Sequence, residues 1–122
     1  MNKVIDTKII QFPKSYTYRP LPIGLFINKS KIEGQGLFTS FPIEENKKLG
    51  VSHIKINNEL FRLPLGGFIN HSYDPNCKLL VEGKSTVGIQ SFYLITIIKI
   101  NSKEELTLNY DDAAKTTKIL WE

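Results

Sequence analysis

The sequence contains few of the residues that build disulfides, metal clusters or nucleic-acid-binding surfaces. It has one cysteine, Cys77, which excludes an internal disulfide and any zinc site made from several cysteines. Only two of its 16 basic residues are arginines, Arg19 and Arg62, so the net charge of +4 comes almost entirely from lysine. Because no cluster of arginines and aromatic residues is present, nucleic-acid binding is not expected. The two histidines, His53 and His71, lack the spacing of a metal-binding motif, so no metal is expected.

The sequence also lacks a long apolar run and an N-terminal signal segment. Its longest apolar stretch, Phe92–Ile100, has the length of a strand and is too short to span a bilayer. The start, Met1–Val4, is not followed by the apolar region of a signal peptide. We therefore expect an intracellular protein that does not insert into membranes. The length of 122 residues suits one domain with a modest core.

Short runs rich in β-branched and aromatic residues, separated by proline, glycine and turn residues, predict a mostly-β fold. Strands are expected at residues 23–27, 49–56, 78–82, 86–90 and 91–100. His53 lies in one of these runs and is interpreted as a surface residue of a strand. Residues 1–19 are predicted to form an N-terminal strap or edge strand on a domain at 20–112. Residues 113–122 are predicted to be a short C-terminal segment that packs on this domain, and the run Asp111–Lys115 is expected to cap and begin a short helix.

The stretch Gly67–Cys77 carries the most unusual arrangement of polar residues. Phe68 and Ile69 are expected to be buried, and the run Asn70-His71-Ser72 follows them. The next residues, Asp74-Pro75-Asn76, predict a tight turn. Amide, imidazole and hydroxyl groups between a core strand and a turn are costly to bury unless protein or ligand satisfies them. Two interpretations are open at this point: a capped turn with a core histidine, or a binding site.

Two further stretches favour the binding site. The chain reads Ser30-Lys31-Ile32-Glu33-Gly34-Gln35-Gly36-Leu37-Phe38 near its start and Glu104-Glu105-Leu106-Thr107-Leu108-Asn109-Tyr110 near its end. Together with Gly67–Cys77, and in this order, the stretches resemble the motifs of the SET-domain family of protein-lysine methyltransferases. The resemblance covers roughly residues 20–112, and the chain is similar in size to the minimal viral SET proteins.

This resemblance implies a fold of several small sheets with a C-terminal pseudoknot, in which the segment after Tyr110 threads beneath the loop that contains Asn70 and His71. It also implies S-adenosyl-L-methionine as cofactor and a lysine-containing protein, such as a histone tail, as substrate. Tyr110 matches the catalytic tyrosine. The residues expected to contact the cofactor are Gly34, Gln35, Gly36, Asn70, His71 and Tyr110, with Trp121 covering the adenine.

The chain departs from the family pattern after the catalytic position, where Asp111-Asp112-Ala113-Ala114 supplies no aromatic residue. The lysine channel must then be completed by other residues, for which the tyrosines offer four candidates: Tyr16, Tyr18, Tyr73 and Tyr93. Because aromatic residues of the channel are missing, a second interpretation stays open: a catalytically silent SET-like scaffold that binds cofactor or a protein partner. A basic nucleic-acid-binding β module is a third alternative, but it leaves the motifs unexplained. The short insert Asn57–Arg62 predicts a homodimer that completes the substrate groove.

Overall fold

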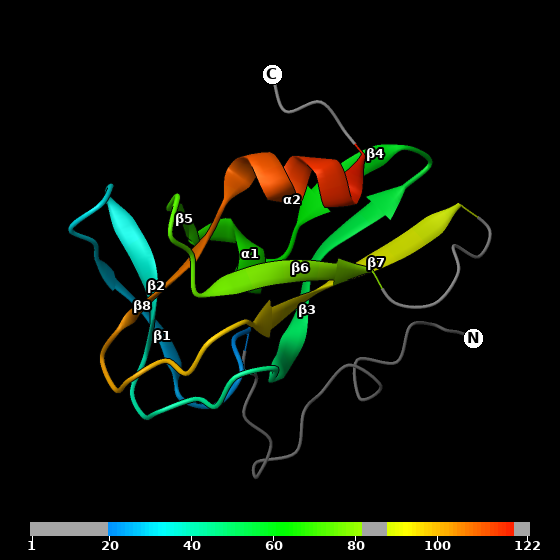
Figure 1. Ribbon diagram of the computed structural model, residues 1–122. Coiled ribbons are helices and arrows are strands. Elements are labelled where there is room, and N and C mark those ends of the chain that lie inside the picture. Colours follow the sequence, from blue (N-terminus) through cyan, green and yellow to red (C-terminus); the bar gives the residue numbers. More distant parts are fainter. Residues whose placement is uncertain (1–19, 82–87, 119–122) are drawn as a thin grey trace, which may run out of the picture.

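The computed structural model describes residues 20–81 and 88–118 (Figure 1). The strap or edge strand predicted at 1–19, the tyrosines Tyr16 and Tyr18, and Trp121 lie outside the described residues. Within the described ranges the elements follow one another in the order β1 (Leu25–Lys29), β2 (Gln35–Thr39), β3 (Lys48–Ile56), β4 (Glu59–Arg62), α1 (Pro64–Gly67), β5 (Asn70–His71), β6 (Cys77–Val81), β7 (Ile89–Thr96), β8 (Glu105–Leu108) and α2 (Tyr110–Thr117).

The strands form two four-stranded sheets, which confirms the prediction of a mostly-β fold built from small sheets. One sheet has the order β1-β2-β8-β5, and the other has the order β4-β3-β7-β6. All pairs are antiparallel except β5 with β8, which run parallel. The late strand β8 therefore lies between two early strands, and α2 follows it across β6 (Figure 1).

The segment predicted as an insert, Asn57–Arg62, is a tight turn followed by strand β4. Asn57 and Asn58 have positive φ angles of 47° and 73°. Asparagine tolerates this left-handed conformation, and two such residues in succession give the turn whose twist suits a two-residue hairpin. Ile56 consequently pairs with Glu59, and the hairpin ends beside the one-turn helix α1, in which Pro64 occupies the first turn.

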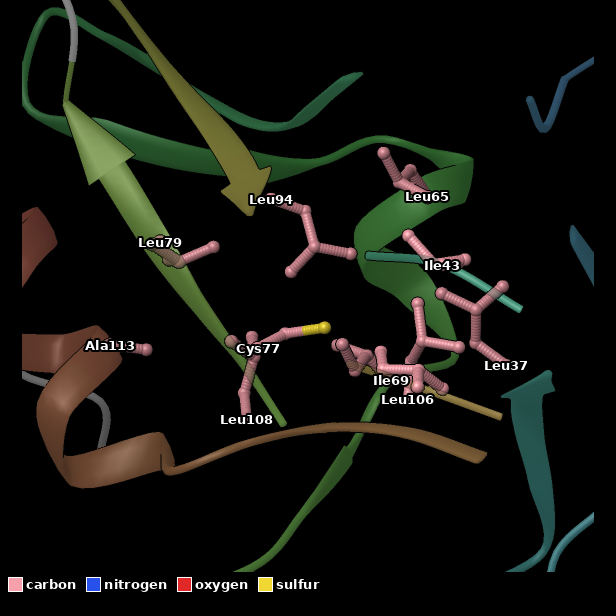
Figure 2. Packing of buried hydrophobic residues seen from close by; sticks show 11 residues of the cluster. Leu37, Ile43, Leu65, Ile69, Cys77, Leu79, Leu94, Leu106, Leu108 and Ala113 are labelled. Atoms are coloured by element: carbon pink, nitrogen blue, oxygen red, sulfur yellow. The ribbon is translucent and has the colours of Figure 1, made fainter. Parts of the chain in front are cut away.

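The hydrophobic core lies between the two sheets, and each helix contributes one buried residue to it (Figure 2). Leu65 comes from α1 and Ala113 from α2, while the other members come from strands and connecting segments: Leu37, Ile43, Ile69, Cys77, Leu79, Leu94, Ile100, Leu106 and Leu108. Burial raises the pKa of the Cys77 thiol to about 12, with a smaller opposing effect from its hydrogen bond with the Thr107 backbone. The cysteine is thus a protonated core residue.

Three sequence-based predictions about individual residues are wrong. His53 is only 1% exposed, because β3 is flanked by β4 and β7 and α1 packs on it. Phe68 was expected to be buried but is 45% exposed, since it follows the short helix α1 and only its neighbour Ile69 reaches the core. Helix α2 is capped by Asn109 rather than Asp111: the Asn109 side chain accepts hydrogen bonds from the backbone N–H groups of Asp111 and Asp112, the second and third helical residues.

Candidate functional site

The parallel pair of β5 and β8 brings together the two polar stretches that the sequence places about forty residues apart. Asn70 is aligned with Thr107, and His71 is aligned with Leu108. The Ser72 backbone N–H extends the contact by donating to the Leu108 carbonyl at 2.8 Å. This adjacency is what the expected pseudoknot requires, while the threading of one segment beneath the other stays a prediction.

Tyr110 is fixed at the end of β8 by two hydrogen bonds to the facing segment. Its hydroxyl donates to the Ile69 carbonyl at 2.6 Å, and its backbone N–H donates to His71 Nδ1 at 3.0 Å. The Tyr110 and His71 rings also meet edge to face, with centroids 5.2 Å apart. Since Tyr110 remains 37% exposed, the hydroxyl is anchored at the surface of the site.

The hydrogen bonds of the two rings indicate the tautomer of a neutral His71 and the donor role of Tyr110. His71 Nδ1 accepts a hydrogen bond from the Tyr110 backbone N–H, so a neutral His71 ring carries its hydrogen on Nε2. The Nε2 atom is buried and has no hydrogen-bond partner within the described residues. Burial raises the pKa of Tyr110 above its usual value, and the positive charge of Arg62 opposes this rise. The phenol is therefore protonated at neutral pH and can donate to Ile69.

Asn70 joins this cluster to the glycine-containing turn at residues 30–36. Its Nδ2 group lies 3.0 Å from the Glu33 carbonyl, 3.1 Å from the Gln35 carbonyl and 2.8 Å from Glu105 Oε2. The three candidate cofactor residues of the turn thus lie next to Asn70. Gly34 has a φ of 42° with open space where a Cβ would project, whereas Gly36 is buried.

Glu105 is a member of the site that sequence reasoning missed. Its carboxylate accepts from Ser30 Oγ at 2.9 Å as well as from Asn70. The signal that could have identified it is the position of this carboxylate directly before the Leu-Thr-Leu run of β8. A charged group beside a strand that enters the core needs a partner if it is half-buried. A Cβ on Gly36 would overlap this carboxylate, so a side chain at that position would displace the carboxylate from its present place.

Asn76 is a second residue whose role was missed. It is 8% exposed, and its side-chain amide bonds the backbone of β8 on both sides of Leu106. Nδ2 donates to the Glu105 carbonyl at 2.8 Å, and Oδ1 accepts from the Thr107 N–H at 2.8 Å. The amide therefore makes the two backbone hydrogen bonds that a neighbouring strand would make to β8, and it connects the turn after Ser72 to that strand.

The structure separates the two described candidates for the lysine channel. Tyr73 lies beside the cluster, with its ring 4.4 Å from the His71 ring and 81% of its surface exposed. Tyr93 lies on β7 next to Leu94, which points into the core, so alternation places Tyr93 on the opposite face of the sheet. There the Lys48 ammonium lies 4.5 Å from its ring centroid. The structure does not bring Tyr93 together with Tyr110.

Two properties of the described part of the chain bear on other classes of function. None of its helices is long and apolar enough to cross a membrane. Within residues 20–81 and 88–118, no three histidine, cysteine, aspartate or glutamate side chains are grouped so that they could hold a metal ion. The described site consists of hydrogen-bonding groups: the Tyr110 phenol, the Asn70 amide, the His71 imidazole and the backbone of a glycine-containing turn.

Comparison with known proteins agrees with this geometry. Residues 53–111, which include Asn70, His71 and Tyr110, match the SET domain family. Among solved structures, the fold resembles a candidate histone methyltransferase of Plasmodium falciparum with a TM-score of 0.61 and 23% identity, covering 71% of this chain and 92% of that one. No curated protein matches the chain. Just under half of the chain thus matches the SET domain, and the fold is similar to that of the solved Plasmodium protein.

Proposed function

We propose that the protein transfers a methyl group from S-adenosyl-L-methionine to the side-chain amine of a lysine in another protein. The observation that carries this proposal is the convergence of the Tyr110 hydroxyl, the Ile69 carbonyl and the Asn70 amide beside the turn at residues 30–36. The match of residues 53–111 to the SET domain supports methyl transfer. The name of the Plasmodium protein, which describes a histone methyltransferase, supports a protein substrate such as a histone tail.

The residues of the site fit the proposed cofactor. Asn70 Oδ1 accepts no hydrogen bond within the described part of the chain, so it offers an acceptor for the ammonium group at the amino-acid end of the cofactor. Gly34 leaves open space beside Asn70, which lets the backbone of Gln35 approach a ligand closely. His71 is the residue that we assign to the adenine, because β5 holds its backbone next to Asn70.

When bound, S-adenosyl-L-methionine supplies a methyl group that its sulfonium centre activates toward nucleophiles. The Tyr110 hydroxyl donates its hydrogen to Ile69, and a phenol oxygen can accept as well as donate, so the group is suited to orient the substrate amine. A neutral phenol is a weak base, and its role here is to orient the amine. Lysine must be deprotonated to react, and an apolar channel lowers its pKa by desolvating the ammonium form.

One observation favours the alternative of a silent scaffold that binds cofactor or a protein partner. Tyr110 is the first residue of α2, and the next two positions are the exposed aspartates Asp111 and Asp112. The described residues directly after the catalytic position therefore add no aromatic wall to the channel. Of the described tyrosines predicted to line it, only Tyr73 lies at the site, and its ring is largely exposed.

The two functions are separated by incubating the protein with S-adenosyl-L-methionine labelled in its methyl group and a mixed protein extract. Acid hydrolysis of the labelled products should yield methylated lysine. Peptides from histone tails, each beside a control in which arginine replaces lysine, then locate the substrate. Binding of the cofactor without transfer to any lysine substrate would favour the scaffold. Absence of cofactor binding would refute methyl transfer and leave only a scaffold that binds a protein partner. The homodimer and the intracellular location remain predictions.

A further inference from the structure

Glu105 connects three segments of the site that are far apart in the sequence. It opens β8, and its two carboxylate oxygens accept hydrogen bonds from Ser30 Oγ, each at 2.9 Å. Its Oε2 atom also accepts from Asn70 Nδ2 at 2.8 Å. One side chain thus holds both the glycine-containing turn and the amide that we assign to the cofactor.

The bond to Ser30 is directional. Ser30 Oγ already accepts hydrogen bonds from the backbone N–H groups of Ile32 at 2.8 Å and Glu33 at 3.3 Å. Its own hydrogen is therefore available to the Glu105 carboxylate, whose oxygens accept it. The Ser30 backbone N–H closes the same turn by donating to the Gly34 carbonyl at 2.8 Å. The shape of the turn is consequently coupled to the carboxylate.

The bond to Asn70 determines which way the amide points. Three oxygens surround Nδ2: the carbonyls of Glu33 and Gln35, and the carboxylate of Glu105. Turning the amide over would place Oδ1 against these three acceptors, which repel it. The carboxylate contributes most to this preference, because hydrogen bonds to charged groups are about twice as strong as neutral ones.

We propose that Glu105 is a positioning residue that holds Asn70 Oδ1 toward the ammonium group of the cofactor. This inference rests on the proposed function, because it takes the cofactor to be S-adenosyl-L-methionine. Glu105 acts through Asn70, so its effect is confined to ligands that possess the amino-acid end. A residue that only stabilised the fold would affect all ligands of the site alike.

The test compares two ligands by calorimetry with the full chain. S-adenosyl-L-methionine has the amino-acid end, whereas 5′-methylthioadenosine has the adenosine and the sulfur but lacks it. In Glu105→Gln, the carboxylate charge is lost and one of the two accepting oxygens becomes an NH2 group, so the hydrogen bonds from Asn70 Nδ2 and Ser30 Oγ lose their charge-assisted strength. We expect the affinity for S-adenosyl-L-methionine to fall by about tenfold or more, the scale of a lost hydrogen bond to a charged group, with methylthioadenosine unaffected.

Glu104→Gln is the matched control, because it makes the same chemical change one residue earlier. Glu104 bonds the backbone N–H of Asn101 at 2.6 Å and makes no contact with the site among the described hydrogen bonds. It should bind both ligands like the parent. In Asn70→Ala, adding Glu105→Gln should cause no further loss of affinity for S-adenosyl-L-methionine, since the amide that it positions is gone. If Glu105→Gln does not fold, Glu105→Asp should give a smaller loss with the same selectivity.

The outcomes separate this inference from the proposed function. An equal loss of affinity for both ligands, or a further loss in the Asn70→Ala background, would overturn the positioning role and leave the cofactor site in place. The same holds if Glu105→Gln binds S-adenosyl-L-methionine as tightly as the parent does. A parent protein that binds neither ligand would overturn the proposed function and this inference with it.

Discussion

Tyr110→Phe tests the catalytic assignment, because it removes a single oxygen atom from the centre of the site. The hydroxyl donates to the Ile69 carbonyl at 2.6 Å, and this bond is partly buried. Its loss should lower the free energy of unfolding by about 1 kcal/mol, the net value of such a bond, because Tyr110 is 37% exposed and water can reach the freed carbonyl. For a domain of this size, that change lowers the melting temperature by about 4 °C.

The effect on catalysis should be much larger than the effect on stability. The phenyl ring still packs against His71, and the Tyr110 backbone N–H still donates to His71 Nδ1, so Asn70 and the cofactor residues keep their positions. We therefore expect the affinity for S-adenosyl-L-methionine to be unchanged. The rate of methyl transfer should fall by about 10²-fold, the scale observed when one preorganised polar group is removed from an active site.

The assay measures single-turnover transfer to a lysine substrate, cofactor affinity and melting temperature for the parent and the variant. Tyr93→Phe makes the same change on the opposite face of the second sheet and should leave the rate unchanged. A fall in the rate of Tyr93→Phe would instead support its predicted place in the channel. An active parent whose Tyr110→Phe variant retains full activity would refute the catalytic assignment.

Three further predictions concern the frame of the site. Gly66→Ala would overlap the Ser52 carbonyl and lie 2.7 Å from His53 Cε1, so it should lower the free energy of unfolding by about 1–3 kcal/mol, whereas Gly67→Ala has open space and should be tolerated. Chemical denaturation of the two variants checks this contrast. Burial, reinforced by the charge of Arg62, lowers the pKa of His53 to about 4. The unfolded chain therefore binds a proton near pH 6.5 while the folded chain does not, and unfolding free energy should fall by about 3 kcal/mol between pH 6.5 and 4. Denaturation as a function of pH should show a shallower decline in His53→Gln, and an equally steep one would contradict the assignment to His53. Asn76→Ala removes the side-chain amide that makes two hydrogen bonds with the backbone of β8, so it should lower the free energy of unfolding by about 2–3 kcal/mol. Melting temperature checks this, with the exposed Asn28→Ala as control.

The sequence by itself determined the class of the fold, and it pointed to the residues of the candidate site. Strand-like runs and turn residues are local signals, so the predicted strands at 49–56 and 78–82 correspond closely to β3 and β6. The order of the three motifs pointed to Asn70, His71 and Tyr110 before any contact between them was known. The structure places these three residues in one cluster.

The tertiary structure alone decided which groups those residues contact. The parallel pairing of β5 with β8, the bonds of Glu105 to Ser30 and Asn70, and the insertion of the Asn76 amide beside β8 join segments 29 to 75 residues apart. Local periodicity carries no information about such distant partners. The burial of His53 was mispredicted for the same reason, since an alternating pattern shows that a residue lies on a strand but does not show that α1 covers it. Polar side chains are assigned their roles by the segments that fold against them, because a buried donor or acceptor must find its partner wherever the chain brings one.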